Sequence, residues 1–454
     1  MAKYFGTDGV RGVANRELTP ELAFQLGRAG AYVLTKKAKN APRVLLAKDS
    51  RRSGDMLEAA LTAGLCSIGA HVFYGGVIPT PAVAYLVCKY KLDAGIMISA
   101  SHNSMEDNGI KFFNGDGYKL HDSIEEEIES YINIGGGDSL PRPEGEGVGI
   151  SGPCPYAEDD YISFLLSSVP GLRLDGMKIA LDCANGATSS VAPKVFEKLG
   201  AEVHTLSNRP NGSNINAGCG STHMESLTKF VKTQGVDLGL AFDGDGDRML
   251  AVDEKGNIID GDAFMAICAI DLKERGQLLK NTLVATSMSN QGLELCCKKN
   301  NIELFRTDVG DRYVLEKMLA DELTLGGEQS GHYIFRQFST TGDGILSGLQ
   351  LVAVMARKKK SISELASAME VFPQILVNTT VPNHRKPELS TNAEIQKLQA
   401  QIEAELAGEG RILVRPSGTE PLVRVMLEGR DLDTITRMAN ELAMLIGSQL
   451  ADKN

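Results

Sequence analysis

The strongest constraint on the fold is a pattern of short apolar runs that alternate with amphipathic segments. Residues 43–101 read as strand, helix, strand, helix and strand: RVLLAKDS, SGDMLEAALTAGLCSIGA, HVFYGGVI, PTPAVAYLVCKYK and AGIMISAS. This order is typical of βαβ units in a mainly parallel sheet. The preceding LTPELAFQLGRAGAYVLTK predicts one more helix, with Thr19 as its N-cap and Pro20 at its first position.

The same pattern restarts twice along the chain. MKIALDCA opens a second unit that runs to VDLGLAFDGDGDR, and TLVATSMS opens a third that runs to LTLGGEQSGHYIF. The tail reads differently, as a strand, a helix, paired strands and a last helix. We therefore expect three similar α/β domains with mixed or parallel sheets and a smaller C-terminal α+β domain. The expected boundaries are 1–153, 154–256, 257–370 and 371–454.

Composition excludes several classes of protein. A chain of 454 residues with 43% hydrophobic residues can bury several cores, and a net charge of -11 disfavours a nucleic-acid binder. The longest apolar run that stands out, AFMAICAI at 263–270, is too short to span a membrane. No signal peptide is expected, and eight Cys without a CxxC pair suit buried thiols in a reducing cytoplasm.

The first candidate site follows the strand AGIMI. It comprises Ser99, Ser101, His102 and Asn103, with Lys111 shortly after. A serine on a tight strand-to-helix turn exposes its hydroxyl, and the backbone N–H groups around it can face a phosphate. The alternative is that Ser101 or Asn103 only caps the next helix. No GxSxG motif is present, which argues against a serine hydrolase.

The second candidate site is DGDGDR at 243–248, directly after the apolar strand LGLAF. Asp243, Asp245 and Asp247 place three carboxylates at alternate positions, and the intervening glycines let all three face one hard cation such as Mg²⁺. A solvated acidic turn is the alternative. An EF-hand is discounted, because Arg248 stands where that loop needs glycine and a strand follows.

The third candidate site is GGEQSGH at 326–332, again after an apolar strand. Glu328, Ser330 and His332 could hydrogen-bond the hydroxyl groups of a polyol. Glycine and glutamate are also ordinary residues in a loop.

The fourth candidate site is RPSGTEP at 415–421, with Arg424 close behind. A guanidinium, two hydroxyls and free N–H groups in a turn match a phosphate dianion, although a simple hairpin turn gives the same letters. Two other patterns are set aside. GVGISG at 147–152 lacks the preceding strand that a dinucleotide site requires, and no GxxxxGK[ST] occurs.

A reactive serine, a divalent metal, a polyol loop and a phosphate loop together point to phosphoryl transfer on a phosphosugar. FGTDGVRG at 5–12, ISASHN at 98–103, DGDGDR, GGEQSGH and RPSGTEP occur in this order, and together they resemble the α-D-phosphohexomutase superfamily. The start of the chain, DCANGATS at 182–189, and NIN followed by CGSTH at 214–223 are most similar to bacterial members that act on glucosamine phosphate.

The resemblance implies four domains around a central cleft, each contributing one loop. It implies that Ser101 is a phosphoserine and that one Mg²⁺ is held by Asp243, Asp245, Asp247 and a phosphate oxygen on Ser101. Proton transfer would involve Lys111, His102 or Arg11. The other implied contacts are Glu328, Ser330, Arg248, Thr307 and Asp308 on the sugar, and Arg415, Ser417, Gly418, Thr419 and Arg424 on the phosphate that does not react.

The implied reaction interconverts glucosamine 6-phosphate and glucosamine 1-phosphate through a sugar bisphosphate. A sugar 1,6-bisphosphate would activate the enzyme, and the product would feed UDP-N-acetylglucosamine and cell-wall synthesis. Family habit suggests a homodimer in the cytoplasm that binds a small phosphosugar, with no nucleic acid and no membrane. Two alternatives remain: a mutase for mannose or glucose phosphate, and a phosphatase with Asp243 as nucleophile.

Overall fold

The computed structural model describes residues 3–6, 8–36, 41–134, 139–406, 408–417 and 420–452. The chain forms two compact units. One unit comprises Met1–Met288 and Asn301–Ala368, and the other comprises Ser289–Asn300 and Met369–Asn454.

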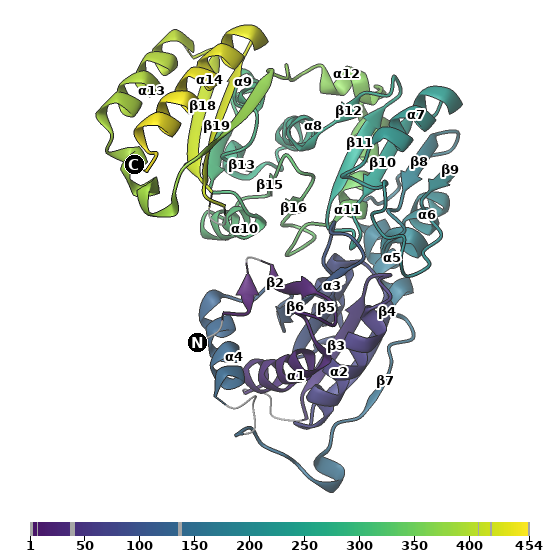
Figure 1. The fold of residues 1–454 in the computed structure, drawn as a ribbon. Coiled ribbons are helices and arrows are strands. Elements are labelled where there is room, and N and C mark those ends of the chain that lie inside the picture. Colours follow the sequence, from purple (N-terminus) through teal and green to yellow (C-terminus); the bar gives the residue numbers. More distant parts are fainter. Residues whose placement is uncertain are drawn as a thin grey trace. The chain divides into compact units, whose positions relative to one another are not determined.

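The first sheet of the larger unit has seven strands (Figure 1). Their order is β1 (Phe5–Gly6), β2 (Gly9–Val13), β6 (Asp107–Asn114), β5 (Ala94–Ile98), β3 (Arg43–Lys48), β4 (His71–Val77) and β7 (Ser151–Pro153). β5, β3, β4 and β7 run parallel, whereas β6 is antiparallel to both β5 and β2.

Helices cover both faces of this sheet. They are α1 (Pro20–Leu34), α2 (Gly54–Cys66), α3 (Thr80–Tyr90) and α4 (Asp122–Asn133). Phe112 packs against α1 at Gly30, and Phe113 lies beside Gly95 on the face that α3 covers. Consecutive strand residues point to opposite faces, so β6 is buried on both sides. The predicted cap of α1 is confirmed, because the Thr19 hydroxyl accepts a hydrogen bond from the Leu22 N–H at 3.2 Å.

The second and third sheets repeat one arrangement. The second has the order β12 (Ile258–Ile259), β11 (Met249–Asp253), β10 (Leu238–Phe242), β8 (Lys178–Asp182) and β9 (Glu202–Leu206). The third has the order β16 (Tyr333–Phe335), β15 (Leu325–Gly327), β13 (Thr282–Thr286) and β14 (Glu303–Thr307). Their helices are α5 (Ala157–Ser167), α6 (Thr188–Lys198), α7 (Glu225–Gln234), α8 (Gly261–Glu274), α10 (Asp311–Ala320), α11 (Gly344–Lys358) and α12 (Ile362–Ala366).

Each of the three sheets contains a parallel strand followed at once by an antiparallel partner. The pairs are β5 with β6, β10 with β11, and β15 with β16. The expected helix after Ser101 is therefore wrong, because Asp107–Asn114 forms a strand instead. The apolar run in DNGIKFFN fills both faces of the sheet, and this burial favours a strand over a helix.

The smaller unit is an antiparallel sheet covered by helices. Its strand order is β17 (Gln374–Thr380), β19 (Leu422–Gly429) and β18 (Gly410–Pro416), and its helices are α9 (Gln291–Lys299), α13 (Ala393–Leu406) and α14 (Leu432–Gln449). Ile435 and Leu442 of α14 share a buried core with Val425 and Leu427 of β19. The fold is thus three α/β domains and a smaller C-terminal α+β domain.

Candidate active site

Ser101 lies in the turn between β5 and β6, and its backbone is strained. Its φ of 54° is in the left-handed region that non-glycine residues rarely adopt. The side chain is buried, and its Oγ donates a hydrogen bond to Asp243 Oδ2 at 2.6 Å. His102 Nδ1 lies 3.2 Å from the same oxygen. Strain of this kind is concentrated at functional sites, where the surrounding structure enforces it.

The three aspartates lie in the turn between β10 and β11. Asp243, Asp245 and Asp247 are all buried, and one carboxylate oxygen from each lies within 4.8 Å of the others. Asp245 Oδ1 and Asp247 Oδ1 have no hydrogen-bond partner in the part of the chain that the structure describes. Burial, with the negative charges of Asp245 and Asp247, raises the pKa of Asp243 well above its ordinary value. A hard divalent cation fits this set of oxygens and would offset its charge.

A line of alternating charges extends from this turn into the first domain. Lys111 Nζ lies 2.8 Å from Asp245 and 2.9 Å from Asp8, and Lys119 Nζ lies 2.6 Å from both Asp8 and Asp311. Two opposing effects act on the pKa of Lys111. Burial lowers it, but the neighbouring carboxylates have the larger combined effect and raise the pKa above its ordinary value. Lys111 therefore stays charged. Arg11 also contacts Asp8.

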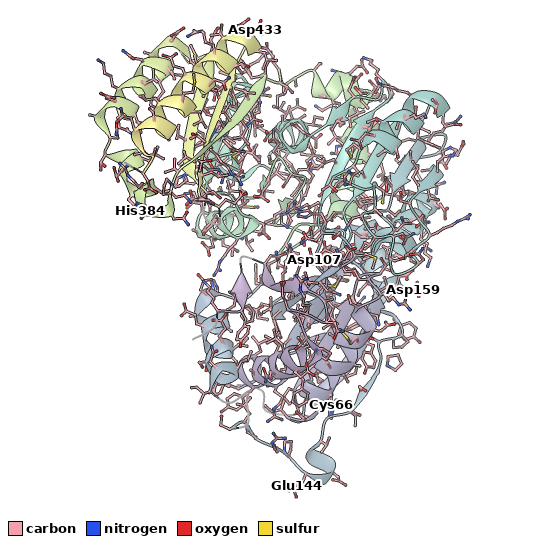
Figure 2. The ribbon with its side chains drawn as sticks, in the orientation of Figure 1. Cys66, Asp107, Glu144, Asp159, His384 and Asp433 are labelled. Carbon is pink, nitrogen blue, oxygen red and sulfur yellow. The ribbon has the colours of Figure 1, made fainter. Side chains whose placement is uncertain are left out.

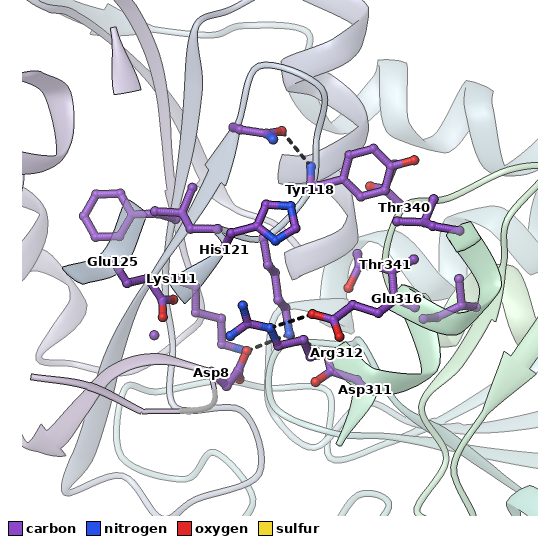
Figure 3. Close-up of a pocket in the computed structure, with 18 residues that line it drawn as sticks. Asp8, Lys111, Tyr118, His121, Glu125, Asp311, Arg312, Glu316, Thr340 and Thr341 are labelled. Carbon is purple, nitrogen blue, oxygen red and sulfur yellow. Dashed lines mark hydrogen bonds and ion pairs between the residues drawn. The ribbon is translucent and has the colours of Figure 1, made fainter. Parts of the chain in front are cut away.

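Sequence reasoning missed Asp8, Lys119 and Asp311 as site residues. Asp8 lies in the FGTDGVRG motif and Asp311 in TDVGDR, so the motifs indicated these segments of the chain but not the roles of the two aspartates. No sequence motif pointed to Lys119, because only the fold brings it between the two carboxylates. Figure 3 shows Asp8, Lys111, Asp311 and Arg312 from the side of a small neighbouring pocket.

The third loop joins β15 to β16. Glu328 Oε1 accepts a hydrogen bond from the Gly310 N–H at 3.1 Å, which ties this loop to the start of α10. His332 is buried, its Nε2 lies 3.6 Å from Asp311, and neither ring nitrogen has a hydrogen-bond partner within the described ranges. The backbone N–H of Arg248 donates to Asp243 Oδ1 at 3.1 Å, and the backbones of Arg248 and His332 form an isolated antiparallel β-bridge that links the second loop to the third.

These loops line one cleft of about 750 Å³ in the larger unit. It is lined by Lys3, Phe5, Gly6, Asp8, Arg11, Ser101, His102, Lys119, Asp122, Asp247, Arg248, Val309, Gly310, Asp311, Arg312, Tyr313, Glu328, Ser330 and His332. Thr307 and Asp308 are not among the lining residues. The Thr307 hydroxyl donates to the Asp308 carbonyl, and the Asp308 side chain is exposed.

The predicted phosphate loop lies in the smaller unit, between β18 and β19. Arg415 and Arg424 are directly opposite each other in the antiparallel pair, and Arg424 Nε is buried with no hydrogen-bond partner among the described residues. Like charges placed opposite each other are unfavourable, and Glu420, whose Oε2 lies 3.0 Å from Arg424 Nη2, offsets part of this charge. Lys386 Nζ, which the sequence did not single out, donates to the carbonyl oxygens of Ser417 and Glu420 at 2.5 and 2.6 Å. Gly418 and Thr419 lie outside the described residues.

None of the helices in the described ranges is long and apolar enough to cross a membrane. The eight cysteines, all within those ranges, are free thiols.

Comparison with known proteins gives consistent matches along the chain. Family models for phosphoglucomutase/phosphomannomutase alpha/beta/alpha domains I, II and III match residues 2–135, 159–256 and 260–372, and the C-terminal domain matches 376–445. A phosphoglucosamine mutase of Ruminiclostridium cellulolyticum is 54% identical over 451 residues, which cover 99% of this chain and 100% of that protein.

Solved structures share the fold at low sequence identity. A phosphoglucomutase/phosphomannomutase family protein of Burkholderia thailandensis has a TM-score of 0.84 at 21% identity, over 100% of this chain and 98% of that one. An N-acetylphosphoglucosamine mutase of Aspergillus fumigatus has a TM-score of 0.69 at 17% identity, over 99% of this chain and 96% of that one. With all four domains matched in order, the chain belongs to the phosphoglucomutase/phosphomannomutase family of the α-D-phosphohexomutase superfamily.

Proposed function

We propose that the chain is a phosphoglucosamine mutase that interconverts glucosamine 6-phosphate and glucosamine 1-phosphate, with Ser101 as the residue that carries the phosphoryl group. The observation that carries this proposal is the Ser101 hydroxyl, held 2.6 Å from Asp243 in a cleft lined by polar side chains. The full-length relative named phosphoglucosamine mutase supports the choice of sugar.

In the reaction, the bond between phosphorus and Ser101 Oγ breaks while a bond to a sugar hydroxyl oxygen forms. The hydroxyl proton leaves to a nearby base, and His102 is suited to receive it. Burial, with the positive charges of Arg248 and Arg11, lowers the pKa of His102, so its ring is neutral at pH 7. Lys111 remains charged and stabilises the negative charge on the transferring group.

Asp243, Asp245 and Asp247, with a phosphate oxygen on Ser101, would hold one Mg²⁺. The ion would neutralise charge on the phosphoryl group as it transfers. Two buried carboxylate oxygens that have no hydrogen-bond partner among the described residues support a cation here. The Aspergillus fumigatus relative was solved in complex with GlcNAc-6P and magnesium.

The sugar must turn around between the two half-reactions. The Glu328 carboxylate would accept hydrogen bonds from its hydroxyl groups, and the Ser330 hydroxyl would donate to them or accept from them. Its other phosphate would bind the smaller unit through the facing pair Arg415 and Arg424 and the loop that includes Ser417, Gly418 and Thr419. Two arginines at facing strand positions, one of them with a buried Nε that has no hydrogen-bond partner among the described residues, support a phosphate at this loop beside the Glu420 carboxylate that Arg424 contacts.

Several further features belong to the same proposal. The enzyme would need a sugar 1,6-bisphosphate to load Ser101, would act as a cytoplasmic homodimer, and would supply a precursor of peptidoglycan. We propose Thr307 and Asp308 only as residues that position the neighbouring cleft segment, because their side chains do not line the cleft.

A phosphorus NMR time course tests the proposal. The protein, primed with glucose 1,6-bisphosphate and Mg²⁺, is incubated separately with the 6-phosphates of glucosamine, glucose, mannose and N-acetylglucosamine. The 1-phosphate is expected to form fastest from glucosamine 6-phosphate. Preference for mannose or glucose would reassign the sugar, and release of free phosphate alone would favour a phosphatase.

Ser101→Ala separates the two chemistries. It should abolish mutase activity, whereas a phosphatase with Asp243 as nucleophile would keep its activity. Ser104→Ala, three residues along the same turn and exposed, is the matched control and should retain activity.

A further inference from the structure

Arg51 is a buried side chain that hydrogen-bonds the backbone of the Ser101 turn. It is 2% exposed, and its Nε pairs with Asp49 Oδ2 at 2.9 Å. The rest of its guanidinium donates to backbone carbonyl oxygens of the turn. The acceptors are Ser101 at 2.9 Å, Asn103 at 2.9 Å, Asp107 at 3.1 Å and Ser104. Asp107, labelled in Figure 2, marks the end of this turn and the start of β6.

A second donor reaches the same carbonyls from another domain. Asn216, in the NIN segment, donates from Nδ2 to the Ser101 oxygen at 2.8 Å and to the Asn103 oxygen at 2.9 Å. Gly244 lies against both partners of this hydrogen bond. A Cβ at Gly244 would lie 2.5 Å from the Ser101 oxygen and 2.8 Å from Asn216 Nδ2, so the packing around the bond leaves no room for a larger side chain. Two domains thus fix the direction of the same two carbonyl groups.

The direction of the Ser101 carbonyl also fixes the next N–H group. No peptide bond among the described residues is cis, and in a planar trans peptide the N–H points away from the C=O. Because the Ser101 oxygen faces Arg51 and Asn216, the His102 N–H faces the opposite side. It has no hydrogen-bond partner within the described ranges. Ser101 and His102 line the cleft, and Arg51 and Asn216 do not.

We propose that Arg51 and Asn216 are positioning residues that turn the Ser101–His102 peptide so that its N–H donates to the phosphoryl group on Ser101. This inference rests on the proposed phosphoserine mechanism. A backbone N–H held in place before the reaction needs no reorganisation as charge develops on the phosphoryl oxygens, which is how oxyanion holes act. The same hydrogen bonds also maintain the left-handed backbone conformation at Ser101.

The test uses Asn216→Ala and Arg51→Lys in the full-length enzyme. Each variant loses donors to the Ser101 and Asn103 carbonyls, and we expect kcat to fall about 10²-fold, as for a reacting group displaced by about 1 Å, while KM changes less than about threefold. Intact mass should show that Ser101 still becomes fully phosphorylated from glucose 1,6-bisphosphate. The double variant should lose less than the product of the two single losses, because both residues act on the same carbonyls.

Arg28→Lys is the matched control. Arg28 is also a buried arginine of the first domain, 1% exposed, and donates to Ser67 Oγ at 2.7 Å and the Leu140 carbonyl at 3.3 Å, away from the cleft. It should lower the unfolding midpoint but leave kcat unchanged. Asn216 is uncharged, so its variant is expected to fold even if Arg51→Lys, which disturbs a buried ion pair, does not.

Two results would overturn the inference. One is a kcat within about threefold of the parent enzyme in Asn216→Ala; the other is a loss of activity that only follows the loss of folded protein, as for a structural residue. Ser101→Ala, assayed alongside, distinguishes the two levels of the argument. If it remains an active mutase, the phosphoserine mechanism itself fails; if it is inactive and Asn216→Ala is fully active, only the positioning role fails.

Discussion

At the scale of single residues, Asp247 is the triad member that receives least help from the protein. Its Oδ1 is buried without a hydrogen-bond partner from any residue that the structure describes, and its Oδ2 is 3.8 Å from Lys111 and 4.0 Å from His332. A buried carboxylate needs compensating charge, which Arg248 supplies only in part. A bound metal would supply the rest, so Asp247 should contribute more to metal binding than to the folded state without metal.

Asp247→Asn is therefore expected to weaken Mg²⁺ binding at least about tenfold, because one anionic ligand is lost. Isothermal titration calorimetry measures the affinity, with Asp116→Asn, an exposed aspartate on another loop, as the control that keeps it. In the parent protein the affinity should fall as the pH is lowered, because the raised pKa of Asp243 lets a proton compete with the ion. An unchanged affinity in Asp247→Asn would contradict the assignment of the metal site.

Gly244 is needed for close approach rather than for an unusual backbone angle. Its hydrogen faces the Ser101 oxygen, where a Cβ would lie at 2.5 Å. Gly244→Ala should push the Ser101 turn away from the aspartates and lower kcat about 10²-fold, as expected for a displacement of about 1 Å. Steady-state kinetics checks this. Gly152→Ala, where a Cβ would meet no atom within 4 Å, should have the activity of the parent.

At the scale of elements, the three proposed active-site loops occupy one recurring place, the turn of a hairpin at the end of a parallel strand. The sequence correctly predicted the parallel strands, since β5, β10 and β15 are apolar runs followed by polar, glycine-rich text. It placed Ser101 before a helix, because a βαβ pattern calls for one there. The strand β6 was not predicted, because Asp, Asn, Gly and Lys interrupt the apolar residues of DNGIKFFN and leave no run like those of the other buried strands.

The helix α4 contains a titratable group whose behaviour is specific enough to test. Glu125 lines the small pocket of Figure 3, and burial raises its pKa from 4.5 to about 7. The folded state therefore holds a proton that the unfolded state releases, so the free energy of unfolding falls as pH rises through this interval.

Glu125→Gln removes that dependence. The variant should unfold at the same temperature as the parent at pH 4 and about 2 °C higher at pH 8, the size expected for about 1 kcal/mol or less in a chain of this length. Differential scanning calorimetry across this pH range measures both midpoints. Glu126→Gln, the exposed neighbour, should show no such divergence. Parallel pH profiles for Glu125→Gln and the parent would show that the carboxyl titrates normally.

At the scale of the whole molecule, the helix α9 belongs to a different compact unit from the segments that precede and follow it in the chain. Sequence reasoning grouped α9 with the third α/β unit, and the matched family domain III also spans it. In the structure α9 belongs to the smaller unit. The Asn290 side chain bonds both the N–H and the carbonyl of Phe372 at 3.0 Å, and the Gln291 N–H donates to Glu428 at 2.9 Å. No local pattern could reveal these long-range hydrogen bonds.

Asn290→Ala should consequently loosen the smaller unit alone. It removes two hydrogen bonds and the N-cap of α9, about 1.4 kcal/mol or more, so amides of β17, β18 and β19 should exchange about tenfold faster. Hydrogen–deuterium exchange with mass spectrometry resolves the two units. Asn440→Ala, on the exposed side of α14, is the control. Equal acceleration in the seven-stranded sheet would show that α9 does not belong to the smaller unit.

The central claim is that Ser101 passes a phosphoryl group to a glucosamine phosphate. The most direct measurement is a single-turnover transfer, in which enzyme loaded with radiolabelled phosphate on Ser101 is mixed with unlabelled glucosamine 6-phosphate. The account predicts that label leaves the protein and appears in sugar phosphates, one per active site, while Ser101→Ala cannot be loaded. Label released only as inorganic phosphate, or retained on the protein while the sugar turns over, would contradict it.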